Sequence, residues 1–161
     1  MLIGLGVTGA KTTGSLLTEL ARWLGEVGIV RGVAVVAEEM RLKNVESPLL
    51  IISPEATFET WRGDFDKQVG SALRQISQLN NLTQLAQQGI VLRRQDEVHL
   101  IVIANPAESW VRQALTGLTD ALRHTVDRTL ACHVGISGVL RAHVFVGGGQ
   151  TWWPIRLRAE R

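Results

Sequence analysis

Three long stretches of the chain carry apolar residues at intervals of three and four positions, the spacing that gathers them on one face of an α-helix. They cover residues 10–27, residues 64–87 (in one long or two short pieces) and residues 107–128. In the first stretch the apolar face includes Leu16 and Trp23. The residues expected to bound these helices are Asp64 as an N-cap, Gly28 and Gly89 as C-terminal stops, and Pro106 near a first turn.

Shorter apolar runs separate these stretches and are expected to form strands. Residues 90–93 and 98–104 are joined by a short charged segment, so we expect them to form an antiparallel hairpin. The tail, residues 152–161, alternates apolar and basic side chains, which suits either an edge strand or a segment that binds a partner. The remaining predicted strands are residues 1–6, 32–39, 49–52, 131–139 and 142–148.

Amphipathic helices of this kind must cover a sheet, so the order of elements predicts an α/β sandwich with a mixed sheet. A length of 161 residues suits one domain with one sizeable core. We therefore expect a single domain over residues 1–161. Within it, residues 1–47 form an N-terminal β-α-β extension, residues 48–149 the core and residues 150–161 the tail.

Composition and charge exclude several classes of protein. With 45% hydrophobic and 20% charged residues, the chain is expected to fold rather than to remain disordered. A net charge of +2 is too small to indicate a nucleic-acid partner. A single cysteine, Cys132, excludes a disulfide framework and fits a reducing, cytoplasmic setting. No apolar run has the length of a membrane span, so we expect a soluble protein.

The amino-terminal glycines form the first candidate ligand-binding site. Gly4, Gly6 and Gly9 have the G-x-G-x-x-G spacing of dinucleotide-binding loops and lead into a helix, whose N-terminus attracts phosphate. Lys11 follows within the same candidate set. The loop is not a Walker A sequence, because Ala10 stands between the last glycine and the lysine.

Two departures from this fingerprint leave other interpretations open. The acid expected to bind ribose, Glu38 or Glu39, comes about thirty residues after Gly9, where roughly twenty from the motif is usual. Only three residues precede Gly4, so the first strand is short. One alternative is a small-residue turn that only leads into a helix. Another is the first phosphate loop of bacterial tubulin-like proteins, which "GLGVTGAK" resembles, although "NPAESW" stands where that family has a second glycine-rich loop.

The charged segment inside the expected hairpin forms the second candidate site. Its order of elements, from strand 49–52 through the hairpin to the strand "CHVGIS", resembles the palm domain shared by GGDEF diguanylate cyclases and class III nucleotide cyclases. Arg94-Gln95-Asp96-Glu97-Val98 stands at the GGDEF signature, and residues 132–137 are similar to a family strand that often reads "VSVGIS". The resemblance covers residues 48–147.

This resemblance implies a palm/ferredoxin-like core and a nucleotide site. The side chains that would act there are Glu55, Asp96 and Glu97 toward Mg²⁺, and Arg93 and Arg94 toward phosphate. The chain has no Asp-x-Asp, and Arg94 and Gln95 replace the glycines that let a triphosphate approach the backbone. The implied protein is thus a non-catalytic or weakly catalytic regulatory or scaffold domain that binds a nucleotide-like ligand or a protein. The alternative is that the charged segment is only a solvated hairpin tip.

Residues 146–154, "VGGGQTWWP", form the third candidate site. Glycine amides can cradle an anion, and the adjacent indoles of Trp152 and Trp153 can anchor a protein partner. One alternative is a loop whose tryptophans pack on the core. Another is that the protein is a structural subunit of a larger assembly, in which Trp152, Trp153 and the basic tail mediate self-association or bind a partner.

Overall fold

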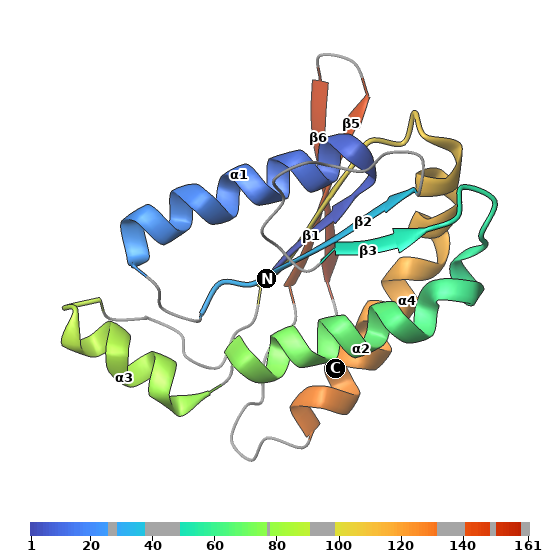
Figure 1. Ribbon diagram of the computed structural model, residues 1–161. Coiled ribbons are helices and arrows are strands. Elements are labelled where there is room, and N and C mark those ends of the chain that lie inside the picture. The colour runs from blue at the N-terminus through green and yellow to red at the C-terminus, as the bar shows by residue number, and fades with distance from the viewer. Residues whose placement is uncertain are drawn as a thin grey trace.

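A computed structural model describes residues 1–25, 29–37, 49–76, 78–90, 99–131, 141–148 and 151–158. Its centre is a six-stranded sheet in the order β3-β2-β1-β4-β5-β6 (Figure 1). The strands are β1 (Leu2–Leu5), β2 (Gly32–Ala37), β3 (Leu49–Ile52), β4 (His99–Ala104), β5 (Arg141–Gly148) and β6 (Thr151–Arg158). The first five strands run parallel, and β6 runs antiparallel to β5. The predicted α/β class with a mixed sheet is therefore confirmed.

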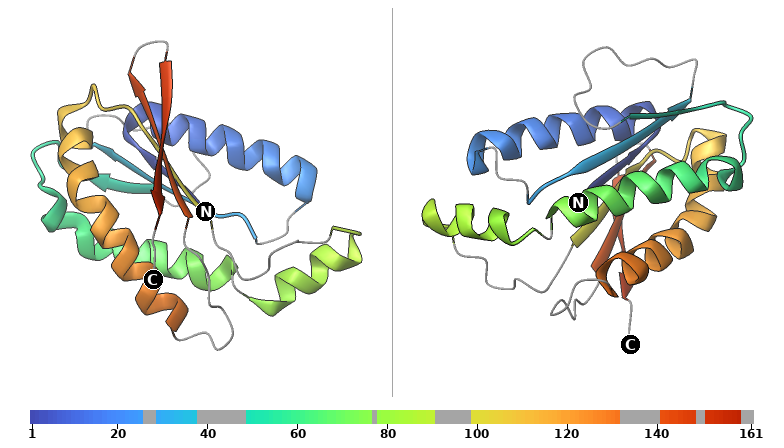
Figure 2. Two further views of the ribbon diagram at one scale, coloured as in Figure 1. Left: turned by 180° about the vertical axis from the view of Figure 1, so that it is seen from behind. Right: turned by 60° about the horizontal axis from the view of Figure 1, so that its bottom comes forward.

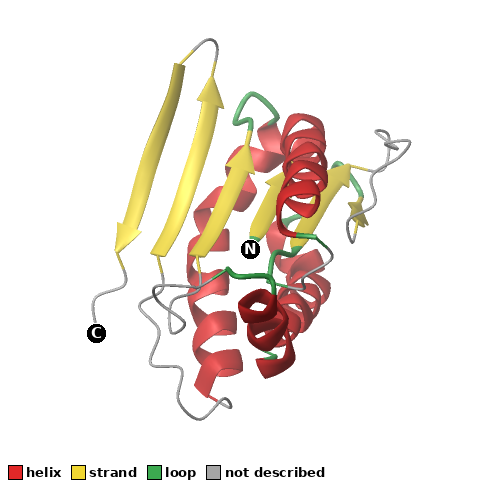
Figure 3. Cartoon of the chain, turned by 90° about the vertical axis from the view of Figure 1, so that its left-hand side faces the viewer, coloured by secondary structure: helices red, strands yellow, loops and turns green. Residues whose placement is uncertain are grey.

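Helices cover both faces of this sheet. The described helices are α1 (Gly6–Leu24), α2 (Phe58–Ile76), α3 (Leu79–Gln87) and α4 (Ser109–Ala131). α1 lies on one face, and α2 and α4 pack together on the other (Figures 2 and 3). None of the helices in the described part of the chain has the length and apolar character that a membrane span requires.

The side chains of β2 alternate between two cores, because successive residues of a strand point to opposite faces. Val33 and Val35 belong to the large core beneath α2 and α4. Ala34 and Val36 face α1, where they pack with Ala10. All six residues of β2 are buried. Its sequence is therefore a continuous apolar run, as expected for a strand inside a parallel sheet.

α1 meets the sheet through small residues rather than through its long apolar ones. The fully buried residues of α1 are Gly6, Gly9, Ala10 and Thr13. Leu16 is 40% exposed and Trp23 is 81% exposed, so the predicted inward face is wrong for these two side chains. The spacing of apolar residues did predict a helix here. Glycine and alanine, however, let the helix approach the strands more closely than leucine would.

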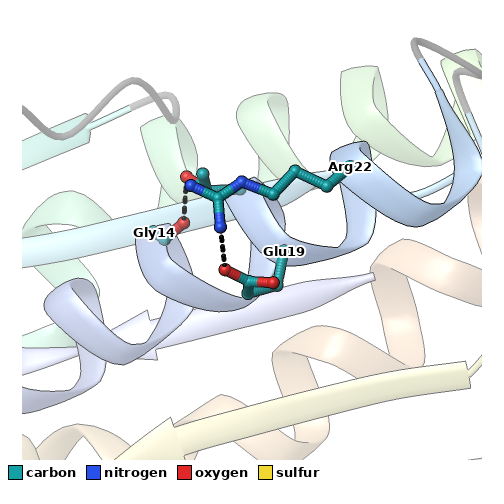
Figure 4. A network of polar contacts seen from close by, with 4 residues as sticks. Gly14, Glu19 and Arg22 are labelled. Carbon is teal, nitrogen blue, oxygen red and sulfur yellow. Dashed lines mark hydrogen bonds and ion pairs between the residues drawn. The ribbon is translucent and has the colours of Figure 1, made fainter.

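The solvent side of α1 carries a small polar network (Figure 4). Arg22 Nη1 donates to Glu19 Oε1 at 2.6 Å, and the Thr18 hydroxyl donates to the Gly14 carbonyl oxygen at 3.0 Å. Both charged side chains are largely exposed. An ion pair of this kind contributes only about 0.3–0.5 kcal/mol, so α1 is held mainly by its buried small residues.

Two helix boundaries differ from those predicted. α2 begins at Phe58, so Asp64 lies inside the helix and is not its N-cap. α1 ends at Leu24 and is followed by Gly25, which has a positive φ of +66°. The chain thus leaves α1 earlier than predicted, and Gly28 lies outside the described residues.

The predicted helix stop at Gly89 is confirmed. Gly89 has a φ of +77°, the left-handed conformation that glycine adopts readily. The Ile90 N–H donates to the Leu85 carbonyl at 2.9 Å, and the Gly89 N–H donates to the Ala86 carbonyl at 3.0 Å. These two bonds form a Schellman motif, which satisfies the last carbonyl groups of α3.

The predicted antiparallel hairpin of residues 90–104 is wrong. β4 forms, as expected, but both of its edges are occupied by parallel neighbours, β1 and β5. On the side of β1, Met1 extends this pairing to the start of β4, because its amino group donates to the His99 carbonyl at 2.6 Å. Residues 91–98 lie outside the described part of the chain.

The strand arrangement expected for a palm-like core is also not found. β4 does not lie beside β3, because β2 and β1 separate them. β1, which was predicted to belong to an N-terminal extension, is a central strand. The tail does form an edge strand, β6, as one of its two interpretations predicted.

Candidate functional site

The chain reverses its direction of travel across the sheet between β1 and β4. From β1 it proceeds to β2 and β3 on one side, then crosses to β4 and continues to β5 on the other side. In open parallel sheets, the carboxyl ends of the strands at such a switch point are the usual ligand site. Leu5 lies opposite Ala104 at these ends. We call the segments that follow them, residues 6–9 and 105–108, the switch-point site.

Gly4 and Gly9 are required for close packing at this site. A Cβ atom on Gly4 would lie 2.6 Å from the carbonyl carbon of Gly9 and 2.6 Å from Thr13 Oγ1. A Cβ atom on Gly9 would collide with the carbonyl oxygen of Ile103 in β4. The two glycines therefore bring α1 against β1 and β4. Close helix–strand packing is the role of the third glycine in dinucleotide-binding loops.

Gly6 has a different role, because it faces an anion. It turns the chain from β1 into α1 with a φ of +75°, a conformation that is costly for any residue with a side chain. A Cβ atom here would lie 2.7 Å from Cδ and 2.8 Å from Oε2 of Glu108. In dinucleotide-binding loops the second glycine gives this close approach to pyrophosphate. Here the carboxylate of Glu108 makes the approach.

A tight turn after β4 positions Glu108. The side-chain oxygen of Asn105 accepts the N–H of Ala107 at 3.0 Å, and the Glu108 N–H donates to the Asn105 carbonyl at 3.3 Å. Pro106, which fixes its own φ, lies inside this turn, three residues before α4 begins. The Glu108 carbonyl accepts the N–H of Arg112 at 3.1 Å. The backbone of Glu108 therefore caps α4.

The carboxylate of Glu108 joins α1 to α4. Its Oε1 accepts the backbone N–H of Val7 at 3.2 Å, and its Oε2 accepts the indole N–H of Trp110 at 3.1 Å. α1 has no acid in its first turn, and the residue preceding it, Leu5, provides no side-chain cap. Because a helix N-terminus carries a partial positive charge, Glu108 supplies the negative charge that α1 lacks.

Trp110 links this contact to an aromatic cluster in the large core. Its ring lies 6.5 Å from that of Trp61, and Trp61 stacks edge-on with Phe58 at 4.7 Å and with Phe65 at 5.7 Å. Trp61 and Trp110 are both buried. The indole N–H of Trp61 has no hydrogen-bond acceptor among the described residues. The carboxylate at the switch-point site is thus connected, through one indole, to the packing between α2 and α4.

The structure brings one predicted set of site residues together. Gly4, Gly6 and Gly9 surround the start of α1, and Lys11 is exposed one turn further along this helix. Glu108 was not identified from the sequence. Its contact with Val7 spans 101 positions, and the only local sign of it is the Asn-Pro turn that places an acid directly before a helix.

Glu55, another predicted site residue, does not lie at the switch-point site. Glu55 is exposed in the turn after β3, beyond β2 and β1. The predicted metal site of Glu55 and Asp96 stays a prediction, because Asp96 lies outside the described residues. The predicted residues outside the described part of the chain are Glu38, Glu39, Arg93, Arg94, Asp96 and Glu97.

The interface at β6 and the metal site stay predictions. Trp152 and Trp153 belong to β6, opposite Gly147 and Val146 of β5, and their role as an interface stays a prediction. Among the described side chains, no group of three or more histidine, cysteine, aspartate or glutamate residues could hold a metal ion. A Mg²⁺ site built on the charged segment likewise stays a prediction.

The amino ends of the strands hold a buried amino group, that of Met1. The amino group of Met1 donates to the His99 carbonyl, and burial lowers its pKa from 8.0 to about 6. The cause is desolvation, which disfavours the charged form. This group lies at the opposite end of β1 from the switch-point site, so it affects stability rather than the site itself.

No protein-family model and no curated protein matches the chain. A solved structure with a similar arrangement is that of an uncharacterized protein from Alicyclobacillus acidocaldarius subsp. acidocaldarius DSM 446. It is 13% identical, the match covers 92% of this chain and 73% of that chain, and the TM-score is 0.42.

Proposed function

We propose that the protein is a regulatory or scaffold domain that binds a nucleotide-like ligand through a phosphate group at the switch-point site. This follows the interpretation based on Gly4, Gly6 and Gly9 rather than the one based on the charged segment. The observation that carries it is the carboxylate of Glu108, which lies over Gly6 and accepts the Val7 N–H. The loop after β1 is thus shaped around an anion, and phosphate is the anion that such loops commonly bind.

Lys11 is the residue expected to add affinity. Side chains of an α-helix tilt toward its N-terminus, so the ammonium of Lys11 can reach an anion held above Val7 and Thr8. Thr8 and Lys11 are both exposed, which leaves them accessible to a ligand. Hydrogen bonds to charged groups contribute about 1.5–3 kcal/mol net, and exposed charge pairs contribute less. We therefore expect Lys11 to contribute to phosphate binding without being essential for the fold.

Isothermal titration with ATP, GTP and a cyclic dinucleotide, each with Mg²⁺, tests the proposal. Lys11→Ala should weaken the binding of whichever ligand gives heat by about three- to tenfold, which corresponds to about 0.7–1.4 kcal/mol. The matched control is Lys67→Ala, an exposed lysine of α2, which should leave the affinity unchanged. Equal loss in both variants would indicate nonspecific charge attraction and would contradict a site at α1.

A second candidate function, assembly with other chains, is favoured by the position of β6. In the described sheet β6 is an edge strand of eight residues, and such an edge can pair with another strand. Light scattering over a range of concentrations would measure the mass of the full chain and of a Trp152→Ala/Trp153→Ala variant. A larger species that is lost in the variant supports this function. A mass that is the same for both chains excludes the two tryptophans as the contact.

A further inference from the structure

We propose that Glu108 is an autoinhibitory anion, which occupies the switch-point site and must leave before a phosphate group can bind. This inference rests on the proposed function, because it describes how that same site is regulated. In this resting state the carboxylate takes the place over Gly6 and the N–H of Val7 that an incoming phosphate would need.

The first reason is that the two anions exclude each other. Glu108 Oε2 would lie 2.8 Å from a Cβ atom on Gly6, so the carboxylate already fills the space above the Gly6 backbone. A phosphate placed there would share one N–H donor with Glu108 and would carry the same sign of charge. Like charges within a few ångströms repel strongly when they are partly shielded from water. Binding therefore requires the side chain of Glu108 to move.

The second reason is that Glu108 can move without unfolding its surroundings. Its backbone carbonyl caps α4 through the Arg112 N–H, and its backbone N–H closes the turn with Asn105. Neither contact involves the carboxylate. The residue is only half-buried, so its side chain has a route to solvent. The carboxylate can leave α1 while the turn and the N-terminus of α4 stay in place.

The third reason is that departure of the carboxylate would affect a contact outside the switch-point site, between α4 and α2. Trp110 would lose the acceptor of its indole N–H, which is Glu108 Oε2 at 3.1 Å. Trp110 packs edge-on against Trp61 of α2 at a ring distance of 6.5 Å. Ligand binding at α1 would thus change a contact between α4 and α2 on the far face of the sheet. This gives the domain a way to report occupancy of the site.

Titration of the full chain with inorganic pyrophosphate and with ATP tests this proposal. The variants are Glu108→Gln, which removes the charge and keeps the shape, and Glu108→Ala, which removes the side-chain group that lies over Gly6. The matched control is Glu19→Gln, an exposed acid of α1, whose side chain pairs only with Arg22 among the described contacts. Thermal unfolding of each variant checks that it is folded. If the site is closed most of the time, opening it should raise the apparent affinity by about tenfold or more.

A nuclear magnetic resonance measurement distinguishes displacement from binding nearby. The indole N–H signal of Trp110, assigned by its loss in a Trp110→Phe variant, should shift when pyrophosphate saturates the wild-type chain. It should move toward its position in the Glu108→Ala variant, because the same hydrogen bond is absent in both. A signal that stays in place at saturation overturns the proposal.

The binding results separate failure of this inference from failure of the proposed function. Tighter binding by both Glu108 variants, with Glu19→Gln like the wild type, supports an autoinhibitory anion. Binding by the wild type that is unchanged or weaker in the Glu108 variants overturns the inference and leaves the function standing. If no folded chain binds pyrophosphate or ATP, the inference and the phosphate-binding function both fall.

Discussion

Replacing Gly6 by alanine should destabilise the protein by two separable effects, and the chain provides a control for each. The first effect is backbone strain, because Gly6 has a φ of +75°. Forcing a residue with a side chain into this conformation costs about 1–2 kcal/mol. The second is the collision of the new methyl group with the carboxylate of Glu108, whose Cδ would be 2.7 Å away.

Gly89 isolates the first effect. Its φ of +77° is nearly that of Gly6, but a Cβ atom there would meet nothing within 4 Å. Gly89→Ala should therefore cost only the strain, about 1–2 kcal/mol. In Gly6→Ala the carboxylate must also give up its bonds from Val7 and Trp110. At about 0.5–1.5 kcal/mol net for each bond, the two lost bonds add about 2 kcal/mol at the middle of that range. The total cost for Gly6→Ala is therefore about 2–5 kcal/mol.

Urea unfolding followed by circular dichroism measures both changes. With an m-value of about 2 kcal/mol per molar urea, an extra 2 kcal/mol lowers the midpoint of Gly6→Ala by about 1 M relative to Gly89→Ala. In a Glu108→Ala background the collision is absent, so Gly6→Ala should then cost about as much as Gly89→Ala. Equal midpoints for the two single variants, or the same Gly6→Ala cost with and without Glu108, would refute the carboxylate's position over Gly6.

Three further predictions concern stability. The Met1 amino group has a pKa of 8.0 when unfolded and about 6 when folded, so the unfolded chain binds more protons between these values. The free energy of unfolding should therefore rise by about 2 kcal/mol from pH 6 to pH 8, and an N-formylated chain, which cannot be charged there, should lack this part of the rise in urea titrations. Gly63→Ala in α2, where a Cβ atom would meet nothing within 4 Å, should raise the free energy of unfolding, measured by urea titration, by about 0.5–1 kcal/mol through helix propensity; a decrease would contradict the open surroundings. Phe65→Ala should cost about 3–5 kcal/mol, because Phe65 is fully buried in the aromatic cluster, and a loss below 1 kcal/mol in calorimetry would mean that this core is not packed as described.

The helices and the α/β class could be predicted from the sequence because both depend on local periodicity. α2, α3 and the stop at Gly89 follow from the spacing of apolar residues and one glycine. The inward face of α1 could not be predicted in the same way. Hydrophobicity points to residues such as Trp23, whereas close approach to the strands selects Gly9 and Ala10.

Strand neighbours were mispredicted because pairing is not a local property. Two apolar runs separated by a few charged residues favour a hairpin. β4 instead pairs with β1, from the other end of the chain, and with β5. Glu108 was not identified from the sequence for the same reason. Its identity as the partner of Val7 depends on which two strands are adjacent, and no spacing within residues 105–110 contains that information.

The place of β1 has a consequence for the synthesis of this protein on the ribosome. β1 is made before its neighbour β4, which is completed only with Ala104, the residue that pairs with Leu5. At translation rates of about 5–20 residues per second, the edge of β1 that pairs with β4 has no partner for about 5–20 s. Nascent chains of this protein should therefore depend on chaperones, or on the early β1-α1-β2 unit, to keep that edge from pairing with another polypeptide.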